Sequence, residues 1–155
     1  MNIQDYKRDE MSKEIRNLFL TIYPNRPDIA DKMCFDENMD RSVSTKVAIV
    51  DGRVIGQANI FLFKNNSEIA NLGYHIHPDF HKMGIGSKLS QQAIEDAKNK
   101  GVKILLVRTD NYNVASINLA KKLGFIEPSD EFIEKHKDMI FHNDIENMVC
   151  LYRLL

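Results

Sequence analysis

The stretch HKMGIGSKL, residues 81–89, places two glycines one residue apart between a strand-like run and a helix-like run. Residues 68–78 before it alternate as a strand does and end at Pro78. Apolar residues after it recur at helical spacing. A turn that lacks side chains at Gly84 and Gly86 presents several backbone N–H groups at the start of this helix. Such a helix start is a favourable place for a phosphate group.

Two common glycine-rich motifs do not fit this stretch. The Rossmann fingerprint needs a third glycine and an acidic residue about twenty positions on, and the P-loop needs Gly-Lys-Ser/Thr after its spaced glycine. A simpler alternative is that Gly84 only serves a tight turn and Gly86 only lets the helix approach the sheet. For two glycines alone this alternative is the better one, so the flanking sequence must decide.

The remaining elements follow from periodicity and turn residues. Asp51-Gly52 predicts a tight hairpin, because this pair readily adopts positive φ angles. Strands are expected at residues 47–50, 53–63, 68–78, 102–107 and 147–155, with a further one beginning at 125–126. Helices are expected at residues 9–22, 27–35, 85–100 and 114–123, with a weak helical pattern in 128–144 and a loop over 35–45.

Composition limits the possible functions. A chain of 155 residues, 43% hydrophobic, fits a single globular domain over residues 1–155. With 21 basic and 22 acidic residues spread along the chain, no basic face predicts a nucleic acid partner. No stretch approaches a signal peptide or the roughly 20 apolar residues of a membrane span, so a cytoplasmic protein is expected. Cys34 and Cys150 have no metal-ligand spacing, so no metal is expected and both thiols are interpreted as buried.

Three segments, in order, resemble the GNAT superfamily of acyl-CoA-dependent N-acyltransferases. Residues 81–86 are similar to its phosphate loop, Gln/Arg-x-x-Gly-x-Gly/Ala. YHIHP, residues 74–78, looks like the strand and corner before that loop. VKILLVRTDNYNVASINLAKKLGF, residues 102–125, resembles the next strand, asparagine, helix and Gly-Phe pair. The resemblance, which spans residues 68–126, implies an α+β fold: a mixed, mostly antiparallel central sheet with helices on both faces, splayed between strands 68–78 and 102–107.

The resemblance also implies a function. The expected enzyme is an N-acetyltransferase that moves an acetyl group from acetyl-CoA to a primary amine of a small molecule, peptide or protein, by direct attack in a ternary complex. The residues that it assigns to coenzyme A are Tyr74, His75, Ile76, His81, Lys82, Met83, Gly84, Ile85, Gly86, Ser87, Asn113 and Ser116. Gly86→Glu is expected to abolish CoA binding and leave the fold largely intact. His81 departs from the usual Gln or Arg, and two interpretations stay open: a phosphate contact and a solvated turn residue.

Catalysis needs a base, because a lysine-like amine with a pKa of about 10.4 is almost fully protonated at pH 7. His75 and Glu68, on or near the strand, are the candidates. The backbone N–H of Ile76 is the candidate oxyanion donor, on the expectation that this strand is distorted there. Many family members have a tyrosine where this chain has Ala120, and that hydroxyl is thought to protonate the departing thiolate. Tyr112 or Tyr74 could replace it, although aromatic residues at such places more often serve packing.

The acceptor side is less defined. Tyr23, Asn25 and Arg26, between the first two helices, are substrate-binding candidates from position alone. The alternative function is a catalytically weak or inert acyl-CoA-binding sensor or partner module with the same fold, and a third possibility is a nucleotide site at the glycine loop. The exposed edge of the last strand, residues 147–155, leaves a homodimer open. The identity of the amine, the base and the oligomeric state are not fixed by the sequence.

Overall fold

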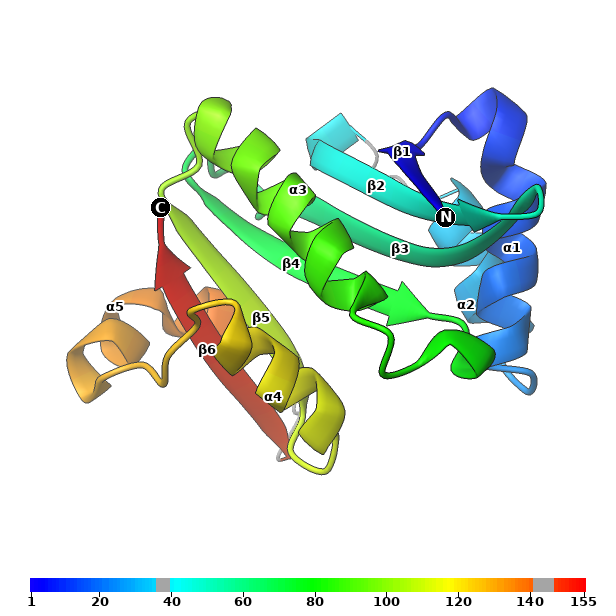
Figure 1. Ribbon diagram of the computed structural model, residues 1–155. Helices are drawn as coiled ribbons and strands as arrows, with labels where there is room; N and C mark the ends of the chain where they lie inside the picture. Colours follow the sequence, from blue (N-terminus) through cyan, green and yellow to red (C-terminus); the bar gives the residue numbers. More distant parts are fainter. Residues whose placement is uncertain (36–39, 141–146) are drawn as a thin grey trace.

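The computed structural model describes residues 1–35, 40–140 and 147–155. Within these residues a six-stranded sheet runs in chain order, β1-β2-β3-β4-β5-β6 (Figure 1). Its strands are β1 (Asn2–Asp5), β2 (Ser42–Val50), β3 (Arg53–Leu62), β4 (Ile69–Ile76), β5 (Ile104–Asp110) and β6 (Met148–Leu154). Neighbouring strands are antiparallel except β4 and β5, which are parallel. The predicted mixed, mostly antiparallel sheet is confirmed.

Helices cover both faces of the sheet, as predicted. They are α1 (Arg8–Ile22), α2 (Pro27–Phe35), α3 (Ile85–Asn99), α4 (Val114–Lys122) and α5 (Asp130–Ile140). Helices α3 and α4 pack on one face, in a core that includes Ala48 and Leu105. On the other face α1 and α2 pack over Val47, and α5 packs over Leu106. Adjacent residues of one strand thus enter different cores, because successive side chains point to opposite faces.

The sheet opens between β4 and β5. The two strands pair only at Ile69–Ile104, Ala70–Leu105 and Asn71–Leu106. Beyond these pairs β4 stays bonded to β3, and β5 stays bonded to β6 through Asp110, so each strand remains regular while the two separate (Figure 1). The predicted splay is confirmed.

The tight hairpin is confirmed by the left-handed backbone of Asp51 (φ 49°) and Gly52 (φ 75°) between β2 and β3. Several boundaries differ from the prediction. Strand β1 was not predicted, because its four residues carry no apolar alternation. Strand β2 begins at Ser42 inside the predicted loop, and residues 125–126 contribute only an isolated bridge, from Ile126 to Tyr152.

The predictions for residues 36–39 and 141–146, and for the Cys34 side chain, lie outside the described part of the chain. Cys150 is a free, partly exposed thiol whose pKa burial raises to about 11. Among the described helices, none is long and apolar enough to cross a membrane.

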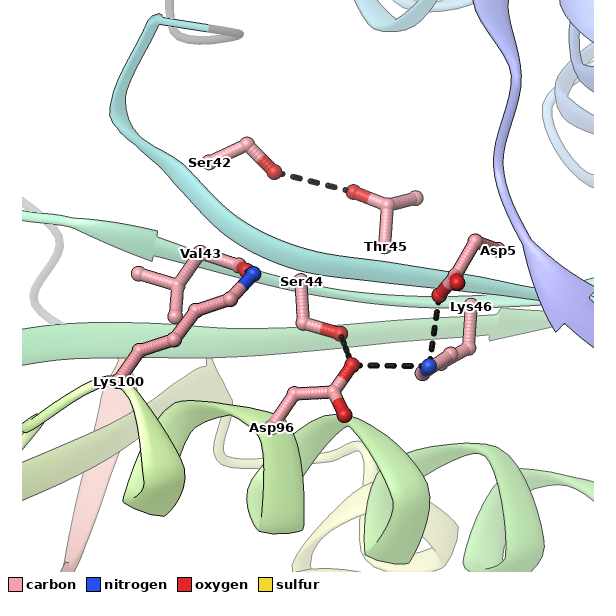
Figure 2. A network of polar contacts seen from close by, with 8 residues as sticks. All are labelled: Asp5, Ser42, Val43, Ser44, Thr45, Lys46, Asp96 and Lys100. Atoms are coloured by element: carbon pink, nitrogen blue, oxygen red, sulfur yellow. Dashed lines mark hydrogen bonds and ion pairs between the residues drawn. The ribbon is translucent and has the colours of Figure 1, made fainter.

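A polar network ties β1 and α3 to β2 (Figure 2). Lys46 Nζ lies 2.6 Å from Asp5 Oδ1 and 2.8 Å from Asp96 Oδ2, and Ser44 Oγ donates to the same Asp96 oxygen at 2.8 Å. Lys100 Nζ donates to a carbonyl of β2. The Lys46 side chain is only 13% exposed, so its charge depends on these partners. The network fixes α3, and therefore the start of α3, relative to the sheet.

We expect Asp96→Asn to lower the free energy of unfolding by about 1–2 kcal/mol at pH 7, because Lys46 loses a charged partner. Burial raises the pKa of Asp96, but hydrogen bonds from Lys46 and Ser44 and nearby positive charge outweigh burial and hold the pKa below its ordinary 3.8. The carboxylate therefore contributes stability above about pH 4 and loses it as the pH falls further. Urea denaturation should show a wild-type advantage at pH 7 that shrinks at pH 3.

The matched control is Asp5→Asn, which removes the other carboxylate of Lys46. Because the Asp5 side chain is 75% exposed, its loss should cost about 0.5 kcal/mol or less. Equal effects of the two substitutions, or a difference at Asp96 that does not change with pH, would contradict this account.

Candidate functional site

The opening between β4 and β5 exposes backbone donors. The His77 N–H donates to the Ile55 carbonyl of β3 at 2.8 Å, and bonded and non-bonded pairs alternate along an antiparallel ladder. Tyr74 and Ile76 therefore point their N–H and C=O groups away from β3, toward the opening that β5 has left. The distortion expected at Ile76 is wrong. Pairing of β3 with β4 runs to Ile76 without a register shift, so the departure of β5 alone exposes these groups.

The glycine loop at one end of the opening is shaped to hold an anion. Lys82 (φ 61°) and Gly84 (φ 75°) both have left-handed backbone, and such residues let successive N–H groups converge. Gly84 is the N-cap of α3, whose first turn contains no acidic residue. Converging N–H groups and a helix start together favour negative charge.

The two glycines of the loop have different roles. A Cβ at Gly86 would lie 3.0 Å from Leu119 Cδ2 and 3.6 Å from Ile76 Cγ1, so Gly86 lets α3, α4 and β4 pack closely. A Cβ at Gly84 would meet no atom within 4 Å, so Gly84 faces open space. A larger side chain at Gly86 would require Leu119 to shift, so the expectation that Gly86→Glu leaves the fold largely intact stays a prediction.

A cavity of about 550 Å³, the loop-side cavity, lies against this loop and the opening. Every residue that the resemblance assigned to coenzyme A lines it except Met83, a residue that is 62% exposed. Lys122 of α4, which was not predicted, also lines it. Among the described residues of its wall, none is a carboxylate, whereas Lys82 and Lys122 are cations. The charge of the wall therefore suits an anionic ligand.

His81 joins the loop to the strand. Its Nε2 lies 3.0 Å from the Ile76 carbonyl oxygen. When the ring carries a hydrogen on Nε2, this nitrogen donates a hydrogen bond to that oxygen. His81 is exposed and lines the loop-side cavity, so a phosphate contact of this residue stays a prediction. The hydrogen bond holds the loop against the end of β4.

A second cavity of about 570 Å³, the strand-side cavity, lies on the face of the sheet that α1 and α2 cover. Its polar wall comes from four strands and from α2: Lys32, Ser42, Thr45, Gln57, Asn59, Asn71, Arg108, Thr109 and Asp110. No motif in the sequence predicts this wall. The only available signal was a polar residue at a core-facing strand position, such as Gln57, which is 4% exposed.

The two cavities meet at a junction, defined by the residues that line both: Tyr23, Tyr74, His75, Asn113 and Ser116. Tyr74 Oη donates to the Ser116 carbonyl at 2.8 Å and lies 3.0 Å from Ser116 Oγ. Asn113 Oδ1 accepts from the Ser116 N–H and caps α4. These contacts link β4 to α4 across the opening, so a group placed at the junction would touch both parts of the sheet.

His75 has the position of a catalytic residue but is held in its neutral form. Its ring packs against Phe19 (centroids 4.7 Å apart) and Tyr23 (6.1 Å). Its Nδ1 is buried and has no hydrogen-bond partner in the described part of the chain. Burial lowers the pKa of His75 to about 4, because a charged ring would lose its hydration. At pH 7 the ring is neutral, and protonation would create a buried cation.

Several other predicted residues lie away from the site. Glu68 is exposed and precedes β4 at its far end, about 20 Å along the strand from His75, so its assignment as a base is wrong. Asn25 and Arg26 line neither cavity, and Arg26 pairs with Asp28 at 2.8 Å on the surface. Ala120 is fully buried. Of the acceptor candidates, only Tyr23 lies at the junction.

Comparison with known proteins agrees with this geometry. The family described as acetyltransferase (GNAT) family matches residues 10–125. L-amino acid N-acyltransferase MnaT of Escherichia coli (strain K12) is 33% identical over 52 residues, which cover 34% of this chain and 30% of that protein. The uncharacterized N-acetyltransferase YvbK of Bacillus subtilis (strain 168) is 33% identical over 90 residues, which cover 55% and 57%. The chain thus matches less than two thirds of the length of either curated relative.

Solved structures match over nearly the whole chain. Ribosomal-protein-alanine N-acetyltransferase from Brucella melitensis superposes with a TM-score of 0.75 at 17% identity and covers 100% of both chains. A Bacillus subtilis acetyltransferase in complex with CoA superposes with a TM-score of 0.69 at 26% identity, over 99% of this chain and 98% of that one. With a family match that extends over most of its length, the chain belongs to the acetyltransferase (GNAT) family.

Proposed function

We propose that this chain is an N-acetyltransferase that moves the acetyl group of acetyl-CoA to a primary amine by direct attack in a ternary complex. The observation that carries the proposal is the junction between an anion-suited cavity and a polar cavity, at an opening of the sheet where backbone donors are unpaired. A donor and an acceptor that enter from opposite faces would meet there.

The loop-side cavity fits coenzyme A. The N–H groups from Met83 to Ser87 would hold the pyrophosphate, with Lys82 and Lys122 adding positive charge. The N–H and C=O groups of Tyr74 that face the opening would pair with the amides of the pantetheine arm, and the Ile76 N–H would stabilise the oxyanion. When bound, acetyl-CoA supplies an activated thioester. The 26% identical Bacillus subtilis relative, solved with CoA, supports this assignment.

The strand-side cavity fits the acceptor. Its wall combines amide side chains with charges of both signs, so it can hydrogen-bond a small polar amine and hold its charged groups. The name of the Escherichia coli relative points to amino acids, but its match covers only 30% of that protein. The proposal therefore extends to a primary amine and no further.

The proposal predicts ligand-dependent stabilisation and turnover. Acetyl-CoA and CoA should raise the melting temperature, whereas ATP should not. At a ligand concentration a hundredfold above Kd, the free energy of unfolding should increase by about 2.7 kcal/mol. Mixed with acetyl-CoA and a panel of amino acids, short peptides and diamines, the protein should release free thiol only when an accepted amine is present. Stabilisation by CoA without amine-dependent thiol release in the whole panel would instead favour a binding module. Stabilisation by ATP alone would favour a nucleotide site.

A matched pair of glycine substitutions tests the loop. Gly84 and Gly52 both have φ of 75° and both face open space, so an aspartate costs the same backbone strain, about 1 kcal/mol, at either position. Gly84→Asp adds a negative charge where the pyrophosphate would bind, and we expect it to weaken CoA binding by about 100-fold or more, as measured by calorimetry. Gly52→Asp, in the remote hairpin, should bind CoA as the wild type does. Equal CoA affinity of the two variants would exclude this loop as the phosphate site.

A further inference from the structure

The register of the parallel pair shows which residues face one another across the opening. The pairs Ile69–Ile104, Ala70–Leu105 and Asn71–Leu106 share one offset. Continued past the separation, this offset sets His75 level with Asp110. Each lies four residues beyond the last pair, or about 13 Å along its own strand. Asp110, at the end of β5, therefore stands opposite the junction.

Asp110 is also distinguished by its charge. Among the described residues that line the two cavities, it is the one carboxylate. Burial, and then the negative charge of Asp110, raise the pKa of Tyr23, a junction residue whose ring lies 6.1 Å from the ring of His75. The field of the carboxylate therefore reaches the place where the two substrates would meet.

Hydrogen bonds reach both the side chain and the backbone of Asp110. Tyr112 Oη donates to Asp110 Oδ2 at 3.0 Å, and the Asn113 N–H donates to the Asp110 carbonyl at 3.0 Å. In the described part of the chain, no side chain donates to Oδ1. One carboxylate oxygen thus accepts a hydrogen bond from Tyr112, and the other can receive a proton.

We propose, on the basis of the function proposed above, that Asp110 is the proton-transferring residue of this enzyme. The bound amine first loses one proton to solvent. The neutral amine then attacks the thioester carbon, and its nitrogen becomes positively charged and strongly acidic. Asp110 takes one proton from this nitrogen. The carbon–sulfur bond then breaks, the sulfur leaves with the electron pair, and Asp110 gives the proton to the thiolate. The products are the amide and CoA thiol, and the carboxylate is regenerated.

Two physical arguments favour Asp110 over its neighbours. Protonation neutralises a carboxylate but would turn His75 into a cation, and a water-poor site favours the neutral product. A protonated carboxylic acid is also a stronger acid than a thiol, so it gives its proton readily to a thiolate. Asp110 would thereby act both as the base and as the acid that a hydroxyl in place of Ala120 would supply.

The test compares Asp110→Asn, Asp110→Glu and Asp110→Ala by thiol release. Asp110→Asn keeps the shape of the side chain but cannot take a proton, so kcat should fall by about 100-fold or more. Asp110→Glu should keep a substantial part of the rate, and added formate should speed Asp110→Ala. Glu127→Gln, which alters an exposed acid outside both cavities, should stay within a few-fold of the wild type.

Binding is measured separately from turnover. The melting-temperature shift produced by CoA should be unchanged in all Asp110 variants, whereas calorimetry should show weaker binding of the protonated amine to the Asp110→Asn complex with CoA. Turnover of Asp110→Asn within about threefold of the wild type, or no effect of formate on Asp110→Ala, would overturn this assignment alone. Absence of thiol release by the wild type with every amine would overturn the proposed function together with it.

Discussion

The early end of pairing between β4 and β5 is the constraint on which the site depends. Three residue pairs hold the two strands together, and Tyr74 and Ile76, whose N–H groups point toward β5, lie beyond the last pair. Unpaired backbone groups are costly when buried, so a sheet can keep them only where a ligand or water satisfies them. The opening is stable because β3 and β6 hold the outer edges of the two strands.

Close packing around the opening determines its shape. Gly86 lets α3 approach Leu119 of α4, and Tyr74 reaches Ser116 from the other side of the gap. The network of Lys46 and Asp96 anchors α3 on β2, far from the loop but on the same helix. The start of α3, the capped start of α4 and the end of β4 are thereby fixed relative to one another, which is what a preorganised binding site requires.

Local signals in the sequence were enough for the parts of the fold that depend on unusual backbone. The turns at Asp51-Gly52 and Gly84 could be predicted because few residues other than glycine readily adopt a left-handed backbone. The role of Gly86 could not, since whether a missing Cβ serves a ligand or a neighbouring helix depends on Leu119, which lies more than thirty residues away. The splay could be predicted only through the resemblance to a family.

The strand-side cavity was beyond prediction for a related reason. Thr45, Gln57 and Asn71 are single polar residues on separate strands, and only the register of the sheet brings them together. The same register places Asp110 opposite His75, a relation between residues of two strands joined by a long crossover. The sequence likewise suggested the ordinary basicity of histidine for His75, whereas burial among aromatic rings lowers its pKa to about 4.

The short pairing between β4 and β5 also divides the sheet into two leaves, which share the core beneath α3 and α4. One leaf holds β1 to β4 with α1, α2 and α3, and the other holds β5 and β6 with α4 and α5 (Figure 1). A ligand that enters between them touches both leaves, so part of its binding free energy stabilises the association of the two leaves. Resistance of the C-terminal leaf to local unfolding, and hence to proteolysis, is therefore coupled to occupancy of the gap.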